Sequence, residues 1–488
     1  MNRLIFQPIE QLIEGLKQKR FSSVELTQAY IERTRAVDKD IQAFISFDEK
    51  KTLAEAEVSD LRRARGETLG DLDGIPIGLK DIFAEKGQRL TCGSRILEKF
   101  ISPYDATVVS KLRAAGAVLW GRLNMDEFAM GSSSENSAFQ VTSNPWDLNR
   151  IPGGSSSGSA AAVAAGEVPL SLGTDTGGSV RQPASLCGII GLKPSYGRIS
   201  RHGMVAYASS LDQAGIFSRT TYGITKLLQA LAGADSKDST CARFKVPNYT
   251  DEINAYKGKK WILGVPSEYF GDGLDSEVRA LVEKAIEFYA RQGYVIKPVH
   301  LKSIEYACPV YYIVATAEAS SNLARYDGIR YTYRSPHAKT LQEVYDKSRS
   351  EGFGAEVKRR ILLGTYVLSS GYYDAFYGKA QKVRRLIYND FMKVFEEVDA
   401  IITPTSPIPA FKKGEKTQDP LTMYLSDIYT ISVNLAGLPG MSIPCGFTKA
   451  GLPVGCQLIG KPWAESSLLT LSQVFEQQHD FNLQIPNI

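Results

Sequence analysis

The chain has 488 residues, of which 43% are hydrophobic and 23% are charged, a composition typical of a globular protein with a large core. Its 57 basic residues are nearly balanced by 53 acidic ones, so the formal net charge of +4 does not indicate a nucleic-acid-binding protein. The sequence contains no apolar run long enough to span a membrane and no apolar core of a signal peptide at its start. The six cysteines form no C-x-x-C pair that would predict a zinc site. We therefore expect a cytoplasmic protein with single, unpaired thiols.

The segment 1–70 is predicted to be mainly helical. Residues 22–25 (SSVE) have the S-x-x-E form of a capping box. Leu26, Tyr30 and Val37 then give the following stretch one apolar face. We expect this helix to pack on the outside of the fold.

From about residue 73 the pattern changes to short apolar runs that are broken by glycine and proline. The clearest of these runs are 74–78, 117–121 and 168–173. Runs of this length between helical segments are typical of buried strands in an α/β sheet.

A strand–helix–strand unit is predicted further along the chain. Residues 261–265 form an apolar run, and the apolar positions of 278–289 follow helical spacing up to Gly293. A second short run, 294–296, comes directly after this glycine. The order predicts a βαβ-like unit.

The segment from about 301 to 390 is predicted to be a helical insertion that covers one side of the sheet. Strand signals become rare in it, whereas 356–368 and 375–388 have helical character. The α/β pattern returns at 400–404, and the segment 441–460 is predicted to form two strands around a turn.

Two Gly/Ser-rich segments carry candidate chemistry. The second, 177–179 (GGS), follows a predicted strand and precedes a predicted helix, so Ser179 is expected at a strand-to-helix corner. Backbone N–H groups of Thr176, Gly177, Gly178 and Ser179 could converge there as an oxyanion hole. A glycine turn with a capping serine would produce the same pattern, and this alternative stays open.

The first segment, 153–159 (GGSSSGS), opens into a helix of small side chains. Phosphate binding at the helix start is one alternative, although no phosphate-loop motif is present. A G-x-S-x-G elbow is another, but proline in the preceding stretch argues against the strand that an elbow needs. Lys80 follows a predicted buried strand, and a lysine in a dry pocket can lose its proton near neutral pH. Such a lysine could draw a proton through one serine from a second, which then attacks a carbonyl.

Three motifs resemble those of the amidase signature family, in the same order and spacing. They are 74–81 (GIPIGLKD), 152–160 (PGGSSSGSA) and 173–179 (GTDTGGS). The resemblance implies one α/β domain over 1–488, with a central mixed β-sheet flanked by helices. It also implies that Ser179 is the nucleophile, that Ser155 is a bridging serine on a cis peptide bond and that Lys80 is the base.

Four further segments resemble one branch of that family, the A subunits of tRNA-dependent amidotransferases. They are 124–132, 318–328, 348–354 and 433–440. The branch implies a glutaminase in a heterotrimer with B and C subunits. The B subunit would use the ammonia, with ATP and Mg, on Glu-tRNA(Gln) or Asp-tRNA(Asn), and the tRNA would be bound mainly there. No cofactor or metal is expected in this chain. A free-standing amidase for another amide and a non-catalytic scaffold subunit remain alternatives.

Glutamine as substrate requires a cation for its α-carboxylate and an anion for its α-ammonium group. By resemblance these are Arg360 and Asp427, with Tyr311, Ser132 and Gly131 lining the pocket. Helical spacing places Arg360 nearer the packed face of its helix, and Arg359 stays open as the other candidate cation.

Overall fold

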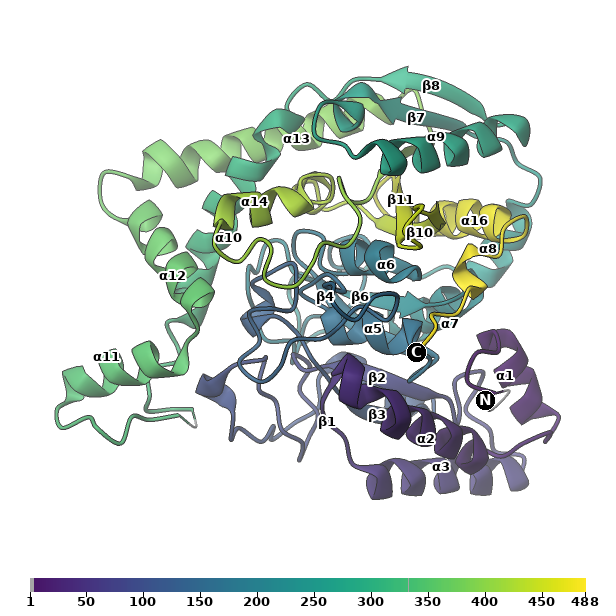
Figure 1. Cartoon of the computed structure of the whole chain (residues 1–488), viewed down its shortest axis with the longest axis horizontal. Coiled ribbons are helices and arrows are strands. Elements are labelled where there is room, and N and C mark those ends of the chain that lie inside the picture. The colour runs from purple at the N-terminus through teal and green to yellow at the C-terminus, as the bar shows by residue number, and fades with distance from the viewer. Residues whose placement is uncertain (1–3, 332) are drawn as a thin grey trace.

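The computed structural model describes residues 4–331 and 333–488. Within these ranges eleven strands form one sheet in the order β1-β3-β2-β4-β6-β5-β10-β11-β9-β7-β8, seen from the lower to the upper part of Figure 1. The strands are β1 (Phe44–Ser46), β2 (Pro76–Lys80), β3 (Val118–Leu123), β4 (Leu170–Asp175), β5 (Ile190–Lys193), β6 (Gln213–Ser218), β7 (Ile262–Pro266), β8 (Val295–Val299), β9 (Ala400–Pro404), β10 (Gly440–Phe447) and β11 (Pro453–Gly460).

The sheet is mixed. β2 runs parallel to β3 and β4, and β7 runs parallel to β8 and β9. The central pairs from β4·β6 through β10·β11 to β11·β9 are antiparallel. The predicted α/β class with a central mixed sheet is therefore confirmed, as is the βαβ unit of β7, α9 and β8.

The N-terminal segment contains α1 (Ile9–Lys17), α2 (Ser23–Ile41) and α3 (Glu49–Ala64). Ser22 caps α2, and its capping box with Glu25 is formed as predicted. The short β1 pairs antiparallel with β3 and extends the sheet. A three-residue strand shows no usable periodicity, so the sequence did not predict it.

Helices flank the sheet in two shells. Those that contact strands are α3, α5 (Ser157–Ala164), α6 (Arg181–Cys187), α7 (Thr221–Leu231), α9 (Ser276–Arg291) and α16 (Glu465–Glu476). Outside them, α1 and α4 (Thr107–Ala114) pack on α7, and α8 (Tyr249–Ala255) packs on α16. α2 packs on α3 and also reaches β3, where Thr34 accepts a hydrogen bond from Trp120. The small side chains of α5 are fully buried, which allows it to lie against four strands at once.

The helical insertion is present at the predicted place in the chain, and its covering of one side of the sheet stays a prediction. It contains α10 (Ala307–Leu323), α11 (Leu341–Gly352), α12 (Ala355–Leu368), the π-helical turn η5 (Tyr373–Gly378) and α13 (Lys379–Val394). α10 packs mainly on α12, α13 and α15 (Ile431–Leu435). Its buried residues lie on all sides of the helix, so it needs helical neighbours around it. In Figure 1, α11 and α12 project away from the sheet.

Within the described ranges, no helix is both long and apolar enough to cross a membrane. The extent of a single domain over 1–488 stays a prediction.

Candidate active site

Lys80 is the last residue of β2 and is fully buried. Its Nζ donates hydrogen bonds to Ser155 Oγ (2.8 Å), Ser156 Oγ (3.0 Å) and Thr174 Oγ1 (2.8 Å). Thr174 lies on β4, the parallel neighbour of β2, so the strand pairing brings the two side chains together. Burial lowers the pKa of Lys80 to about 7, against the opposing attraction of nearby carboxylates such as Asp126. A substantial neutral fraction near pH 7 follows.

The loop before α5 is closely packed. The Gly154–Ser155 peptide bond is cis, as the resemblance implied. Gly154 N–H donates to Gln182 Oε1 (3.0 Å), and Ser156 N–H donates to Ser179 O (3.3 Å). A Cβ added at Gly154 would lie 2.1 Å from Asp126 Oδ2, so this glycine permits a close approach. Three N–H groups of this loop, those of Gly154, Ser156 and Gly158, are engaged inside the protein, which argues against a phosphate cradle. Residues 151–153 before it form no strand, so the elbow match is accidental.

Ser179 lies at the predicted strand-to-helix corner, between β4 and α6, and is 8% exposed. Asp175, at the end of β4, holds this corner in place. It accepts hydrogen bonds from Gly178 N–H (2.8 Å) and Val180 N–H (3.2 Å), and it pairs with Arg181 (3.0 Å). Burial alone would raise the pKa of Asp175, but Arg181 outweighs it and holds that pKa at about 2. The loop that carries Ser179 is therefore fixed by a buried ion pair.

Gly178 is removed from the predicted oxyanion hole. Because the N–H of Gly178 already donates to Asp175, the groups left for the oxyanion are those of Thr176, Gly177 and Ser179. In the described part of the chain, no hydrogen bond joins Ser155 Oγ to Ser179 Oγ. The structure thus brings Lys80 into contact with Ser155 and places the Ser179 loop beside them, whereas the link between the two serines stays a prediction.

Arg360 is buried on α12, and Arg359 is half-exposed. Arg360 Nε donates to Glu356 Oε1 (2.7 Å), and its Nη1 donates to the hydroxyl of Tyr207 (2.7 Å). The guanidinium also lies 5.2 Å from the ring centre of Tyr424. The prediction that Arg360 faces the packed side of its helix is confirmed.

Asp427 ends the 3₁₀ turn η6 (Leu425–Asp427). Its Oδ2 accepts a hydrogen bond from Ser132 Oγ, whereas its Oδ1 is buried and has no hydrogen-bond partner in the ranges 4–331 and 333–488. Burial raises the pKa of Asp427 to about 7. An unpartnered buried carboxylate oxygen is costly in an apo protein, so it indicates a place for a positively charged ligand group.

Tyr311 connects the two ends of the site. A Cβ added at Gly177 would lie 2.7 Å from the Tyr311 ring, so this side chain packs directly on the loop that carries Ser179. On its other side it contacts Tyr312, whose ring lies 5.3 Å from the Arg360 guanidinium.

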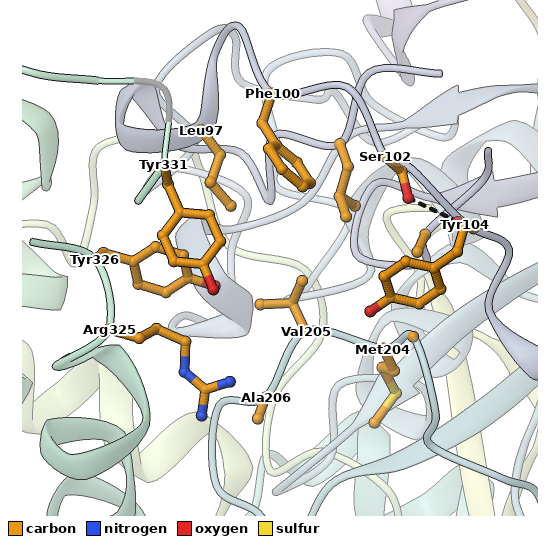
Figure 2. A pocket seen from close by; sticks show the side chains of 13 residues that line it. Leu97, Phe100, Ser102, Tyr104, Met204, Val205, Ala206, Arg325, Tyr326 and Tyr331 are labelled. Atoms are coloured by element: carbon orange, nitrogen blue, oxygen red, sulfur yellow. Dashed lines mark hydrogen bonds between the residues drawn. The ribbon is translucent and has the colours of Figure 1, made fainter. Parts of the chain in front are cut away.

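A cavity of about 200 Å³ opens beside Arg360, and Gly131, Glu356 and Tyr424 also line it. A second pocket, of about 160 Å³, is shown in Figure 2. It is walled by aromatic side chains such as Tyr331 and contains none of the predicted site residues. The first cavity, not the second, is therefore the candidate substrate entrance.

Several site residues were missed by the sequence analysis. Ser156 and Thr174 lie inside the quoted motifs, and their polarity next to a buried lysine could have indicated them. Tyr207 lies outside every motif, and no sequence signal points to its contact with Arg360. Among the described residues, no group of three or more His, Cys, Asp or Glu side chains could hold a metal ion.

Comparison with known proteins gives a consistent result. The family model described as Amidase matches residues 25–469. The A subunit of the Glutamyl-tRNA(Gln) amidotransferase from Myxococcus xanthus is 57% identical over 94% of this chain and 94% of its own length. The corresponding A subunit from Geotalea daltonii is 56% identical over 97% of both chains.

Solved structures agree in fold. The crystal structure of the Glutamyl-tRNA(Gln) amidotransferase A subunit from Thermotoga maritima has a TM-score of 0.82 at 40% identity, covering 100% of this chain and 98% of that one. The native peptide amidase from Stenotrophomonas maltophilia has a TM-score of 0.81 at 29% identity, covering 97% and 96%.

Proposed function

This chain belongs to the Amidase family, and from that premise we propose that it is the glutamine-hydrolysing A subunit of a tRNA-dependent amidotransferase. The observation that carries the amidase chemistry is the fully buried Lys80, whose Nζ lies 2.8 Å from Ser155 Oγ. The assignment to the A subunits is supported by relatives of that name at 54–57% identity over nearly the whole chain.

The proposed reaction begins at Ser179. Its Oγ attacks the side-chain carbonyl carbon of glutamine, while its proton passes through Ser155 Oγ to the neutral amine of Lys80. The carbonyl oxygen, now negative, is held by backbone N–H groups of Thr176, Gly177 and Ser179.

Collapse of this intermediate breaks the C–N bond. The leaving nitrogen takes the proton back from Lys80 through Ser155 and departs as ammonia. Water then attacks the glutamyl ester, its proton following the same route to Lys80, and glutamate is released as Ser179 regains its hydrogen.

Glutamine is proposed to lie between Arg360 and Asp427. The Arg360 guanidinium would bind the α-carboxylate, and the free Oδ1 of Asp427 would accept a hydrogen bond from the α-ammonium group. Tyr311, Ser132 and Gly131 would line the pocket between these charges and Ser179. A simple amide without both charges would leave this buried carboxylate unpaired, which favours glutamine over other amides.

The ammonia is proposed to pass to a B subunit, which would bind ATP and Mg and convert Glu-tRNA(Gln) or Asp-tRNA(Asn), with a C subunit in the same cytoplasmic complex. The site described above offers no phosphate cradle, since its Gly/Ser loop is filled by its own packing. This is consistent with ATP binding by the partner.

The test is the variant Ser179→Ala. We expect glutamine hydrolysis to be abolished with the fold intact, measured as ammonia release and by circular dichroism. Ser185→Ala is the matched control, because Ser185 is also buried, on α6, but is hydrogen-bonded to Gly455 of β11. It should retain activity. Turnover by Ser179→Ala would contradict the assignment.

Two further results separate the alternatives. Covalent capture of Ser179 by an acyl-trapping reagent would exclude a non-catalytic scaffold. A rise in glutaminase rate on adding the B and C subunits with charged tRNA would exclude a free-standing amidase.

A further inference from the structure

The outer side of α12 and the turn after it is apolar and open to solvent. Its members, which we call the aromatic face, are exposed to between 37% and 70%: Leu362, Leu363, Tyr366, Tyr372, Tyr373 and Phe376. Monomeric proteins seldom leave so many large apolar side chains together in water.

Three rings of the aromatic face are in contact with one another. Leu362 and Tyr366 are four residues apart on α12 and so share one side of the helix. The Tyr366 ring lies 4.6 Å from the Tyr372 ring, which in turn stacks on Phe376 at 5.8 Å. Figure 1 places α12 at the outer edge of the molecule, away from the sheet.

The inner side of α12 is also apolar, and it is already used. Val357, Gly364 and Val367 are buried there, and the helix packs on α10. A surface helix normally buries one apolar stripe and keeps its other side polar. Apolar residues on both sides indicate that a second protein covers the outer one.

The charge around the aromatic face is positive. Residues 358–388 contain seven Lys and Arg and one acidic residue, Asp374, although two of the seven, Arg359 and the buried Arg360, pair with Glu356. Lys379, Lys382 and Arg385 are exposed on α13, next to the turn. A complementary partner surface would therefore be apolar with carboxylates at its border. The four rings of the aromatic face could pack against either a protein or nucleic-acid bases. Leu362, its most exposed member at 70%, and Leu363 favour a protein over tRNA, because aliphatic side chains offer no ring on which bases could stack.

We infer that the aromatic face is the docking surface for the ammonia-accepting partner subunit, which contacts it through an apolar patch bordered by carboxylates. The inference rests on the proposed function. Binding of a partner to this surface should also affect glutamine binding, because Arg360 lies on the inner side of the same helix, α12. A partner bound to the outer side would hold α12 in place and lower the KM for glutamine.

The first test compares two exposed leucines on helices. Leu362→Asp places a charge in the aromatic face, and Leu61→Asp places one on α3, where the leucine is 57% exposed. The chain is co-expressed with the B and C subunits of the same organism, and binding is measured on the purified subunits. We expect roughly thirty-fold weaker binding for Leu362→Asp, the size of an interface hot spot, and wild-type binding for Leu61→Asp.

The second test identifies what covers the surface. A photo-crosslinking residue, p-benzoylphenylalanine, replaces Tyr366 in the full complex with tRNA present, and adducts are identified by mass spectrometry. We expect crosslinks to the B subunit. Crosslinks to a second copy of this chain or to tRNA would overturn the inference.

The outcomes separate this inference from the proposed function. If the wild-type chain assembles with B and C and Leu362→Asp assembles equally well, the docking surface is wrong while the function stands. If the wild-type chain hydrolyses glutamine but does not assemble, both the proposed partners and the docking surface are wrong.

Discussion

The proposed catalytic centre, around Lys80, and the proposed recognition end of the site, around Arg360 and Asp427, are built in different ways. Lys80 and Thr174 lie on adjacent strands of the sheet, fully buried and hydrogen-bonded. Arg360 and Asp427 come from α12 and η6, elements that project from the sheet or lie beside it. The difference indicates that the chemistry is fixed by backbone pairing, whereas the substrate specificity depends on how appended helices pack.

The two regions also differ in how their charges are compensated. In the catalytic centre, the Asp175 carboxylate binds Arg181 and backbone N–H groups on both oxygens. At the proposed recognition end, Asp427 keeps one buried oxygen that has no hydrogen-bond partner among the described residues. A fully compensated network is rigid before substrate arrives, whereas we propose that the recognition end is completed by its ligand.

Replacement of Lys80 by methionine should reduce glutamine hydrolysis more than any change at the Arg360 and Asp427 end of the site. Lys80→Met removes the proposed base, so kcat for glutamine should fall by roughly 10²–10⁴-fold, the usual contribution of general base catalysis. In the wild-type enzyme, kcat should rise with pH through about 7, because the pKa of Lys80 is lowered to that value and only the neutral amine accepts a proton. Steady-state kinetics across pH 5–9 measure both.

Lys193→Met is the matched control for this change. Lys193 is equally buried, and burial lowers its pKa to about 7 as well, but the hydrogen bond of its Nζ among the described residues goes to Pro194 O. We expect it to retain kcat. If both variants lost activity equally, burial of a lysine and not its contact with Ser155 would be the common cause.

The pair Arg360→Lys and Arg359→Lys tests the recognition end. Arg360 is buried with its guanidinium bonded to Glu356 and Tyr207, so lysine would lose the forked contact to the substrate carboxylate. We expect KM to rise roughly 10- to 100-fold, as for a lost hydrogen bond to a charged group, with kcat little changed. Arg359→Lys should keep the wild-type KM. The reverse pattern would assign the carboxylate to Arg359.

The same contrast explains what could be predicted from the sequence. Lys80, Ser155 and Ser179 lie in local motifs, and β2 and β4 were predicted as strands, so pairing of these strands was enough to bring the motifs together. The position of the insertion was not predictable, because helix-on-helix packing of α10 and α12 depends on contacts that no local pattern contains. Tyr207 was missed for the same reason, since its role arises from Arg360, a residue distant in the sequence.

Gly364→Ala should have the smallest effect on glutamine hydrolysis. It tests directly whether glutamine binding depends on the packing of α12 while the chemistry at Ser179 does not. A Cβ at this position would lie 1.9 Å from the backbone oxygen of Thr316, so α12 must shift away from α10. Overpacking of this kind costs about 1–3 kcal/mol, and the shift would move Arg360 with its helix. We expect a several-fold rise in KM for glutamine, while the rate of acyl trapping at Ser179 stays at the wild-type value, because the sheet is untouched. Gly378→Ala is the control, since a Cβ there meets no atom closer than 3.7 Å. A parallel loss of acyl trapping in Gly364→Ala would mean that the insertion and the catalytic centre form one rigid unit.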